Sequence, residues 1–231
     1  MNALIVVAHP DDEVLGCGAT GAALAIGGHS VRACFLSGHA EARGGRPTGE
    51  QLEADMREAQ RLLGFSEPFL GGFPNIRLNT VPHIELVQFI EAAMLECGAD
   101  VIFTHHPGDV NDDHVQVSRA CMAAARLAQR RPPLPKLRRL CFMEIPSSTD
   151  WSFAGSGTRF DPDTFVAVGA TFARKLAALR AYRGVIRAYP HPRSEETLSA
   201  LATFRGSQAG IGLAEAFVTA HCSGSAQDIF G

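Results

Sequence analysis

Three carboxylates and one imidazole fall within residues 9–13 (HPDDE), directly after the apolar run at residues 3–8. Packing this much negative charge together is unfavourable unless a cation or a helix N-terminus offsets it, and a divalent metal is the simplest such cation. His9 and Asp12 supply one nitrogen and one oxygen donor. A zinc site that does chemistry typically has three protein ligands and an open position for water. The segment therefore predicts two ligands of a catalytic metal.

A second polar loop, residues 105–114 (HHPGDVNDDH), follows the apolar run at residues 101–104. In α/β folds, ligands bind at the carboxyl ends of the strands, and both loops follow such ends. Either loop alone is also typical of an exposed turn with capping aspartates. Their joint occurrence after two predicted strands favours one shared site, whose third ligand comes from the second loop.

Both loops resemble motifs of the LmbE-like or PIG-L family of zinc-dependent N-deacetylases. That family acts on N-acetylglucosaminyl groups in inositol lipids, thiol cofactors, antibiotics and related glycoconjugates. Its first motif, AHPDDE, stands intact at residues 8–13, and its second, a polar run ending in Asp-His, matches residues 105–114. The resemblance extends to residues 144–149, 191–194 and 215–217, and so covers nearly the whole chain.

The resemblance implies that His9, Asp12 and His114 bind zinc and that Asp11 is the general base. Zinc polarises the acetyl carbonyl and lowers the pKa of its water, while a carboxylate that is not a ligand takes the water's proton and later delivers it to the leaving amine. Two histidines and one aspartate also accept other divalent metals. We therefore expect one divalent ion per chain, with zinc as the implied metal.

One position departs from the family pattern. Asn111 stands three residues before the last ligand, where many members have a histidine that stabilises the oxyanion. An asparagine amide can donate a hydrogen bond but cannot titrate. His191 is the candidate to replace the missing histidine as donor or acid, and a surface turn is the alternative interpretation. Asp113 is expected to orient His114 or a neighbour.

Sugar hydroxyls need polar partners, and three arginines on predicted loops could face the site, although exposed arginines are often only solubilising. These candidates for substrate binding are Arg43, Arg77 and Arg193. The expected partner is a small N-acetylated sugar conjugate. Its sugar and acyl group depend on the shape of the pocket and stay open at this point.

Short apolar runs alternate with amphipathic segments along the chain. This alternation predicts an α/β fold, a three-layer Rossmann-like sandwich with a mostly parallel sheet, as a single domain over residues 1–231. The predicted strands are residues 3–8, 31–36, 69–71, 101–104, 140–145 and 165–168. The predicted helices are residues 13–27, 50–63, 82–97, a segment ending near 130, 171–182 and 195–207.

Two other classes of protein compete with this interpretation. Residues 16–21 (GCGATG) meet the G-x-G-x-x-G spacing of dinucleotide-binding enzymes, but they lie inside a predicted helix and could not cradle a pyrophosphate at its N-terminus. Close packing of helix on sheet explains these glycines better. A metal-containing binding protein is the other alternative, and Asp11 favours catalysis over it. Hydrolysis of a different amide or ester remains open, because fold does not settle chemistry.

The formal net charge of −3 gives no electrostatic footprint for nucleic acid. The N-terminus does not resemble a signal peptide, and no apolar run approaches the length of a membrane span. The six cysteines are spread without a C-x-x-C pattern, which favours reduced thiols. We therefore expect a cytoplasmic protein without nucleic-acid or integral membrane association, and leave association into a homo-oligomer open.

Overall fold

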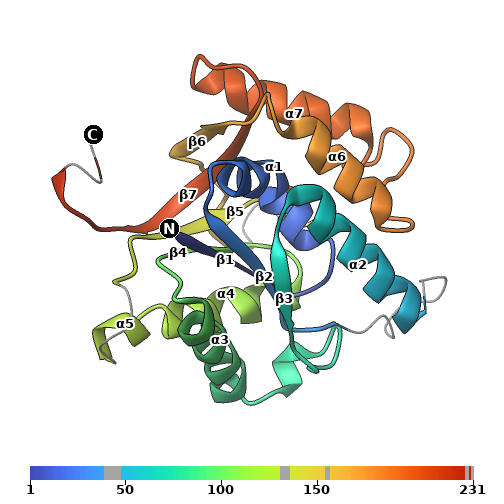
Figure 1. Cartoon of the computed structure of the whole chain (residues 1–231). Coiled ribbons are helices and arrows are strands. Elements are labelled where there is room, and N and C mark those ends of the chain that lie inside the picture. Colours follow the sequence, from blue (N-terminus) through green and yellow to red (C-terminus); the bar gives the residue numbers. More distant parts are fainter. Residues whose placement is uncertain (39–47, 131–135, 154–156, 227–228, 230–231) are drawn as a thin grey trace.

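The computed structural model describes residues 1–38, 48–130, 136–153, 157–226 and 229. Seven strands in this part of the chain form one sheet: β1 Asn2–Val7, β2 Ser30–Phe35, β3 Ser66–Leu70, β4 Val101–His105, β5 Arg139–Met143, β6 Thr164–Ala167 and β7 Ala214–Cys222. Their order across the sheet is β3-β2-β1-β4-β5-β7-β6 (Figure 1). The first five strands in this order are parallel, and β7 runs antiparallel to both β5 and β6.

Helices cover both faces of the sheet and complete three layers (Figure 1). One face carries α1 Asp12–Ile26, α2 Gly49–Leu63, α6 Phe172–Ala181 and α7 Glu195–Gln208. The other carries α3 His83–Cys97, α4 Asp112–Ala124 and α5 Leu127–Arg130, and a 3-10 helix, η1, spans Leu78–Thr80. The predicted α/β sandwich with a mostly parallel sheet is confirmed. None of the helices that the structure describes has the length and apolar character needed to cross a membrane.

Strand β1 shows why a uniformly apolar run predicts a strand that is buried at the centre of the sheet. Ile5 and Val7 belong to the core under α1, whereas Leu4 and Val6 belong to the core under α3 and α4. All four side chains are fully buried. A parallel strand that is covered on both faces needs apolar residues at every position, which explains the uniform run.

Two elements differ from the sequence prediction. Strand β7 was not predicted, because its first four residues are buried, its last three are exposed, and the buried half contains Glu215. Such a strand shows no clean alternation. The helix predicted to end near residue 130 instead ends at Ala124, and the short α5 follows after a turn.

Helix α1 is interrupted at Cys17, whose backbone (φ −149°, ψ 15°) is not helical. Beyond the break, the amide of Thr20 donates to the buried Glu215 carboxylate at 2.7 Å. Before the break, Leu15 O accepts from Lys175 Nζ at 2.7 Å, and the same ammonium lies 2.6 Å from Glu215. This buried ion pair therefore satisfies backbone groups that the interruption removes from the helical ladder.

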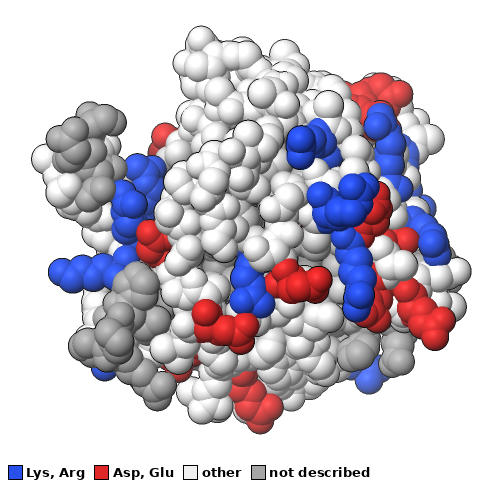
Figure 2. All heavy atoms as spheres, in the orientation of Figure 1, with Lys and Arg blue, Asp and Glu red and all other residues white. Residues whose placement is uncertain are grey.

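Charged side chains of both signs share the molecular surface. On the face shown in Figure 2, lysine and arginine side chains alternate with aspartate and glutamate. Some charged side chains of the described residues are paired: Arg180 Nη2 lies 2.5 Å from Glu195, and Arg183 Nε lies 3.3 Å from Asp55. On this face, the described residues therefore form no continuous basic surface of the kind that tracks a nucleic-acid backbone (Figure 2).

The glycines of α1 let the helix approach the sheet closely. A Cβ atom added at Gly16 would lie 2.4 Å from Met143 Sδ, and one added at Gly21 would lie 2.4 Å from Phe65 Cζ. Both glycines lie inside the helix. Their spacing therefore serves packing, as the sequence indicated.

We expect Gly16→Ala to lower the free energy of unfolding by about 1–3 kcal/mol, because the new methyl group must displace buried side chains of β5. Gly49→Ala is the matched control, since a Cβ added there meets nothing within 4 Å. Urea denaturation of both variants measures the difference. Equal unfolding free energies for the two variants would contradict the packing role.

Candidate active site

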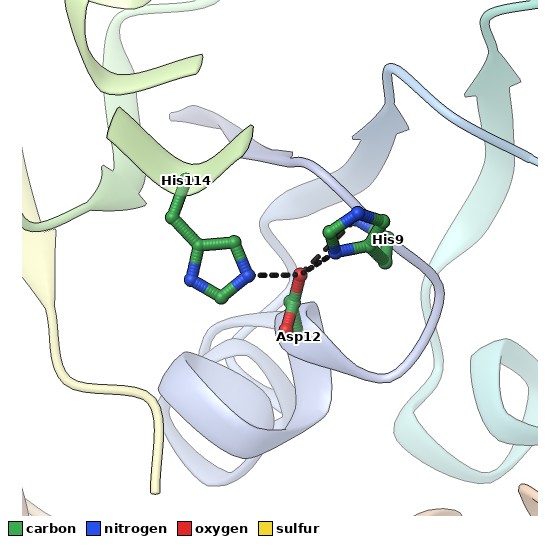
Figure 3. A group of neighbouring side chains, drawn as sticks. All are labelled: His9, Asp12 and His114. Carbon is green, nitrogen blue, oxygen red and sulfur yellow. Dashed lines mark hydrogen bonds and ion pairs between the residues drawn. The ribbon is translucent and has the colours of Figure 1, made fainter. Parts of the chain in front are cut away.

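The turn after β1 and the first turn of α4 meet at the carboxyl edge of the sheet (Figure 3). Asp12 Oδ2 lies 3.3 Å from His9 Nδ1 and 3.3 Å from His114 Nε2. All three residues are buried, and their ligand atoms lie within 4.8 Å of one another. The group can hold one metal ion through two nitrogens and one oxygen, a donor set that suits zinc and related divalent metals.

Each of the two histidines has a second carboxylate partner, on the ring nitrogen that faces away from Asp12. Asp113 Oδ2 lies 3.0 Å from His9 Nε2, and Asp109 Oδ2 lies 3.1 Å from His114 Nδ1. Because each carboxylate engages one ring nitrogen, the other nitrogen is fixed toward Asp12. Metal-binding histidines almost always have such partners, so the surroundings fit a metal as well as the ligands do.

Both supporting carboxylates are themselves held in place. Asp113 accepts hydrogen bonds from the amides of Ile76 and Leu78, at 2.7 and 3.0 Å. Asp109 accepts from the hydroxyls of Ser148 and Thr149, the latter at 2.8 Å. The sequence predicted that Asp113 would orient His114 or a neighbour, and the structure places it on His9.

Electrostatics favour a positive charge at the centre of the group. Burial lowers the pKa of His114, but the negative charges of Asp12 and Asp109 outweigh burial and raise it to about 10. Burial raises the pKa of Asp109, but its hydrogen bond to His114 and the charge of that ring lower it to about 2. A metal ion that binds there therefore competes with a proton on His114.

His105, the last residue of β4, packs directly against the ligands. Its ring stacks on that of His114, with 3.9 Å between ring centroids, and its Nε2 accepts from the amide of Ala8 at 2.9 Å. Burial and the charge of His114 lower the pKa of His105 to about 3, so the ring is neutral. His105 therefore holds the end of β1 and packs against one face of the His114 ring.

A second group of residues could also hold a metal. His105, Asp109 and His114 have ligand atoms within 4.8 Å of one another. His105 lacks the second carboxylate partner that His9 and His114 have, however, because its Nε2 accepts from a backbone amide and its Nδ1 is buried without a hydrogen-bond partner among the described residues. The group of His9, Asp12 and His114 therefore fits better.

Asp11 is held in an unusual conformation beside this group. Its backbone (φ 105°, ψ −30°) lies where residues with side chains rarely occur, at a cost of about 1–3 kcal/mol. Its amide donates to Glu13 Oε2 at 3.0 Å, and its Oδ2 lies 3.0 Å from Arg193 Nη1. Arg193 Nε also donates to Ser147 Oγ at 2.8 Å. These contacts fix the carboxylate of Asp11, the residue before Asp12, and Asp11 does not belong to the group that could hold a metal.

Glu13 does not contribute charge to the metal group. Its side chain accepts from the Tyr182 hydroxyl at 2.7 Å and from Gln60 Nε2 at 3.0 Å. Burial raises the pKa of Glu13 to about 8, so the carboxyl group is largely protonated at neutral pH. Of the three carboxylates in the first motif, this one serves to hold the turn that carries Asp11.

The other predicted residues have mixed placements. Asn111 caps α4, because its Oδ1 accepts from the amide of Asp113 at 3.0 Å. His191 is half-buried, and its Nδ1 accepts from the amide of Arg193 at 3.0 Å. Arg77 is exposed at the N-cap of η1.

Arg43 lies outside the described residues. Arg193, predicted to bind substrate, contacts Asp11. Sequence reasoning missed this contact, as well as the roles of Asp109, His105 and Glu13. The available signal was their position, since three of these residues stand within the two polar motifs and Arg193 stands in a segment shared with the family.

The model of the PIG-L family, described as GlcNAc-PI de-N-acetylase, matches residues 4–125, just over half of the chain. This chain therefore belongs to the PIG-L family. It is 28% identical over 189 residues to a protein of Escherichia coli K12 named as an uncharacterised deacetylase, YaiS, covering 78% of this chain and 89% of that protein.

Solved structures share the whole fold. The conserved protein TT1542 of Thermus thermophilus is 30% identical, with a TM-score of 0.78 and coverage of 96% of each chain. The N,N'-diacetylchitobiose deacetylase of Pyrococcus horikoshii is 18% identical, with a TM-score of 0.74 over 94% of this chain and 83% of that one. GalB, a 4-carboxy-2-hydroxymuconate hydratase of Pseudomonas putida KT2440, is 21% identical, with a TM-score of 0.75 over 97% and 98%. The last two likenesses concern the fold alone.

We expect Asp109→Asn to weaken the binding of a divalent metal about 10- to 100-fold, because His114 loses the carboxylate that orients its ring. Asp112→Asn is the matched control, since it makes the same chemical change in the same motif, at an exposed position at the start of α4. Titration of the metal-free proteins with zinc measures both affinities. Equal affinities would show that Asp109 does not support a ligand.

Proposed function

We propose that this chain is a zinc-dependent hydrolase that removes an N-acetyl group from an amino sugar or its conjugate. The observation that carries the proposal is the carboxylate of Asp11, which directly precedes Asp12 in the chain, is held by Arg193, and does not belong to the group of His9, Asp12 and His114. Membership of a deacetylase family supports the reaction class. When bound, zinc polarises the acetyl carbonyl and makes water a better nucleophile.

Asp11 acts as the general base. It takes a proton from the attacking water and delivers it to the nitrogen of the leaving amine, so one group serves both steps. Arg193 holds the carboxylate at 3.0 Å, and the unusual backbone of Asp11 fixes its direction. Both features reduce the reorganisation that the proton transfers require.

Asn111 and His191 are the proposed groups for the oxyanion. The cap on α4 uses Asn111 Oδ1, and a donor to an oxyanion would be the amide nitrogen of the same side chain. His191 stands two residues before Arg193, which contacts Asp11, so this segment reaches the side of the site that carries the base. Either donor would stabilise charge that develops in the transition state.

The proposed substrate is a small N-acetylated sugar conjugate, and the proposed location is the cytoplasm. Arg43 and Arg77 are proposed to bind its hydroxyls. Arg193 is proposed to bind a hydroxyl while it stays paired with Asp11. Hydrolysis of another amide or acyl group is the alternative for the same site. The hydratase with this fold shows that the fold supports other reactions, so the substrate has to be tested directly.

The first test is release of acetate from a panel of N-acetylated amino sugars and their conjugates by metal-free, zinc-restored and Asp11→Asn proteins. We expect zinc-dependent release that falls about 10²- to 10⁴-fold in Asp11→Asn, while that variant keeps its metal. His114→Ala and Asp12→Ala are expected to lose both metal and activity.

Asp112→Asn is the control for the same chemical change at an exposed position, and it should keep wild-type turnover. Wild-type turnover by Asp11→Asn would overturn the assignment of the base. Failure to release acetate from any substrate, with metal bound, would favour another acyl group or a binding role.

Replacement of His191 tests whether it is catalytic. If His191 stabilises the oxyanion, His191→Ala lowers kcat about 10²-fold or more without loss of metal. His83→Ala, at an exposed position at the start of α3, is the matched control. Wild-type kcat in His191→Ala would remove His191 from the reaction and leave Asn111 as the candidate.

A further inference from the structure

Trp151 is the only tryptophan of the chain, and 49% of its surface is exposed. It lies in the segment that follows β5. A large aromatic side chain left in water forgoes the stabilisation that burial would give. An indole kept at the surface beside a catalytic group is therefore a candidate contact for a ligand.

The segment that carries Trp151 is firmly attached to the loop of the metal group. Ser148 and Thr149 donate to Asp109, which supports the ligand His114. On the other side of the indole, Ser152 Oγ donates to the carbonyl of Gly108 at 2.7 Å. The backbone is thus anchored on both sides of Trp151 in the sequence, so a ligand that covers the indole has to order little of this segment.

The indole also lies on the side of the site that carries the general base. Its ring stands edge-on to His191, with 5.8 Å between centroids and 69° between planes. His191 accepts from the amide of Arg193, and Arg193 pairs with Asp11. A continuous set of contacts therefore leads from Asp11 to the exposed indole.

Polar residues adjoin this aromatic pair in the chain. Asp150 directly precedes Trp151, and its Oδ1 accepts from the amide of Ser148 at 3.0 Å. Tyr189, two residues before His191, is 70% exposed. A pyranose ring presents an apolar C–H face and a rim of hydroxyls, which match an exposed aromatic face bordered by hydrogen-bonding groups.

We propose that Trp151, beside His191, forms a second sugar subsite, in which the indole stacks on the pyranose ring that is linked to the acetylated sugar. This inference rests on the proposed function, because the first sugar must place its acetamido group at the metal. The preferred substrate is then at least a disaccharide or a comparable glycoside. Other occupants of the indole, such as an alkyl chain, are outcomes of the test.

Because Trp151 is the only tryptophan, intrinsic indole fluorescence reports on this ring alone. The probes are N-acetylglucosamine, the disaccharide N,N'-diacetylchitobiose and an octyl N-acetylglucosaminide, each titrated into zinc-loaded Asp11→Asn protein to prevent turnover. We expect a saturable change in emission with the disaccharide, and an affinity about tenfold above that for the monosaccharide. Unchanged emission with the disaccharide, or a change with the octyl glycoside alone, would overturn the subsite.

Kinetics of otherwise wild-type variants give a second test. Trp151→Ala should raise KM for the disaccharide about tenfold, while kcat and the constants for the monosaccharide stay within about twofold. Trp151→Phe should restore most of the affinity. Phe204→Ala is the control, since it removes an equally exposed ring on α7. An equal rise in KM for both sugars would show a general structural effect and contradict the proposal.

Failure of the subsite and failure of the proposed function give different results. Emission that responds to the disaccharide, in a protein that releases no acetate from any sugar, would keep the subsite and overturn the deacetylase. Acetate release by the wild-type protein with an unresponsive indole would do the reverse.

Discussion

The buried carboxylate of Asp12 is the constraint on which the rest of the site depends. It lies between the rings of His9 and His114, and it also accepts from the amide of His9 at 3.1 Å. A buried carboxylate is costly unless it is paired and hydrogen-bonded, so the surrounding residues must deliver positive charge to this point. Asp109 and Asp113 lie against the ring nitrogens that face away from Asp12, and their negative charges further favour a cation at this point. A divalent cation satisfies it more fully than a proton on His114 alone, which is why the cluster fits a metal.

The fold brings these groups together through ordinary rules of parallel sheets. Strands β1 and β4 are neighbours, so the loops that follow them meet at one edge. The site also needs support from distant segments. Arg193 comes from the segment before α7 to hold Asp11, and the segment after β5 supplies Ser148 and Thr149 to hold Asp109. The Lys175–Glu215 pair bridges the break in α1, the helix that begins at Asp12.

The sequence was informative where chemistry and local pattern coincide. A shared site could be predicted because two polar motifs follow two apolar runs. The choice of His114 within the second motif came from the family resemblance, and the structure brings it together with His9 and Asp12. Contacts such as Arg193 with Asp11, which are 182 residues apart, depend on how distant loops pack and have no local signature. The structural role of Glu13, which holds the turn that carries Asp11, could not be predicted for the same reason. Its partners Tyr182 and Gln60 belong to other segments of the chain. Strand β7 was not predicted because a buried glutamate interrupts its apolar pattern.

The central claim is that His9, Asp12 and His114 hold a zinc ion beside Asp11. X-ray absorption at the zinc edge, on the zinc-loaded wild-type protein and on His114→Ala, tests it most directly. We expect nitrogen and oxygen donors without sulfur in the wild-type protein, and loss of one nitrogen donor or of the metal in the variant. An unchanged zinc spectrum in His114→Ala, or sulfur among the donors, would contradict the account.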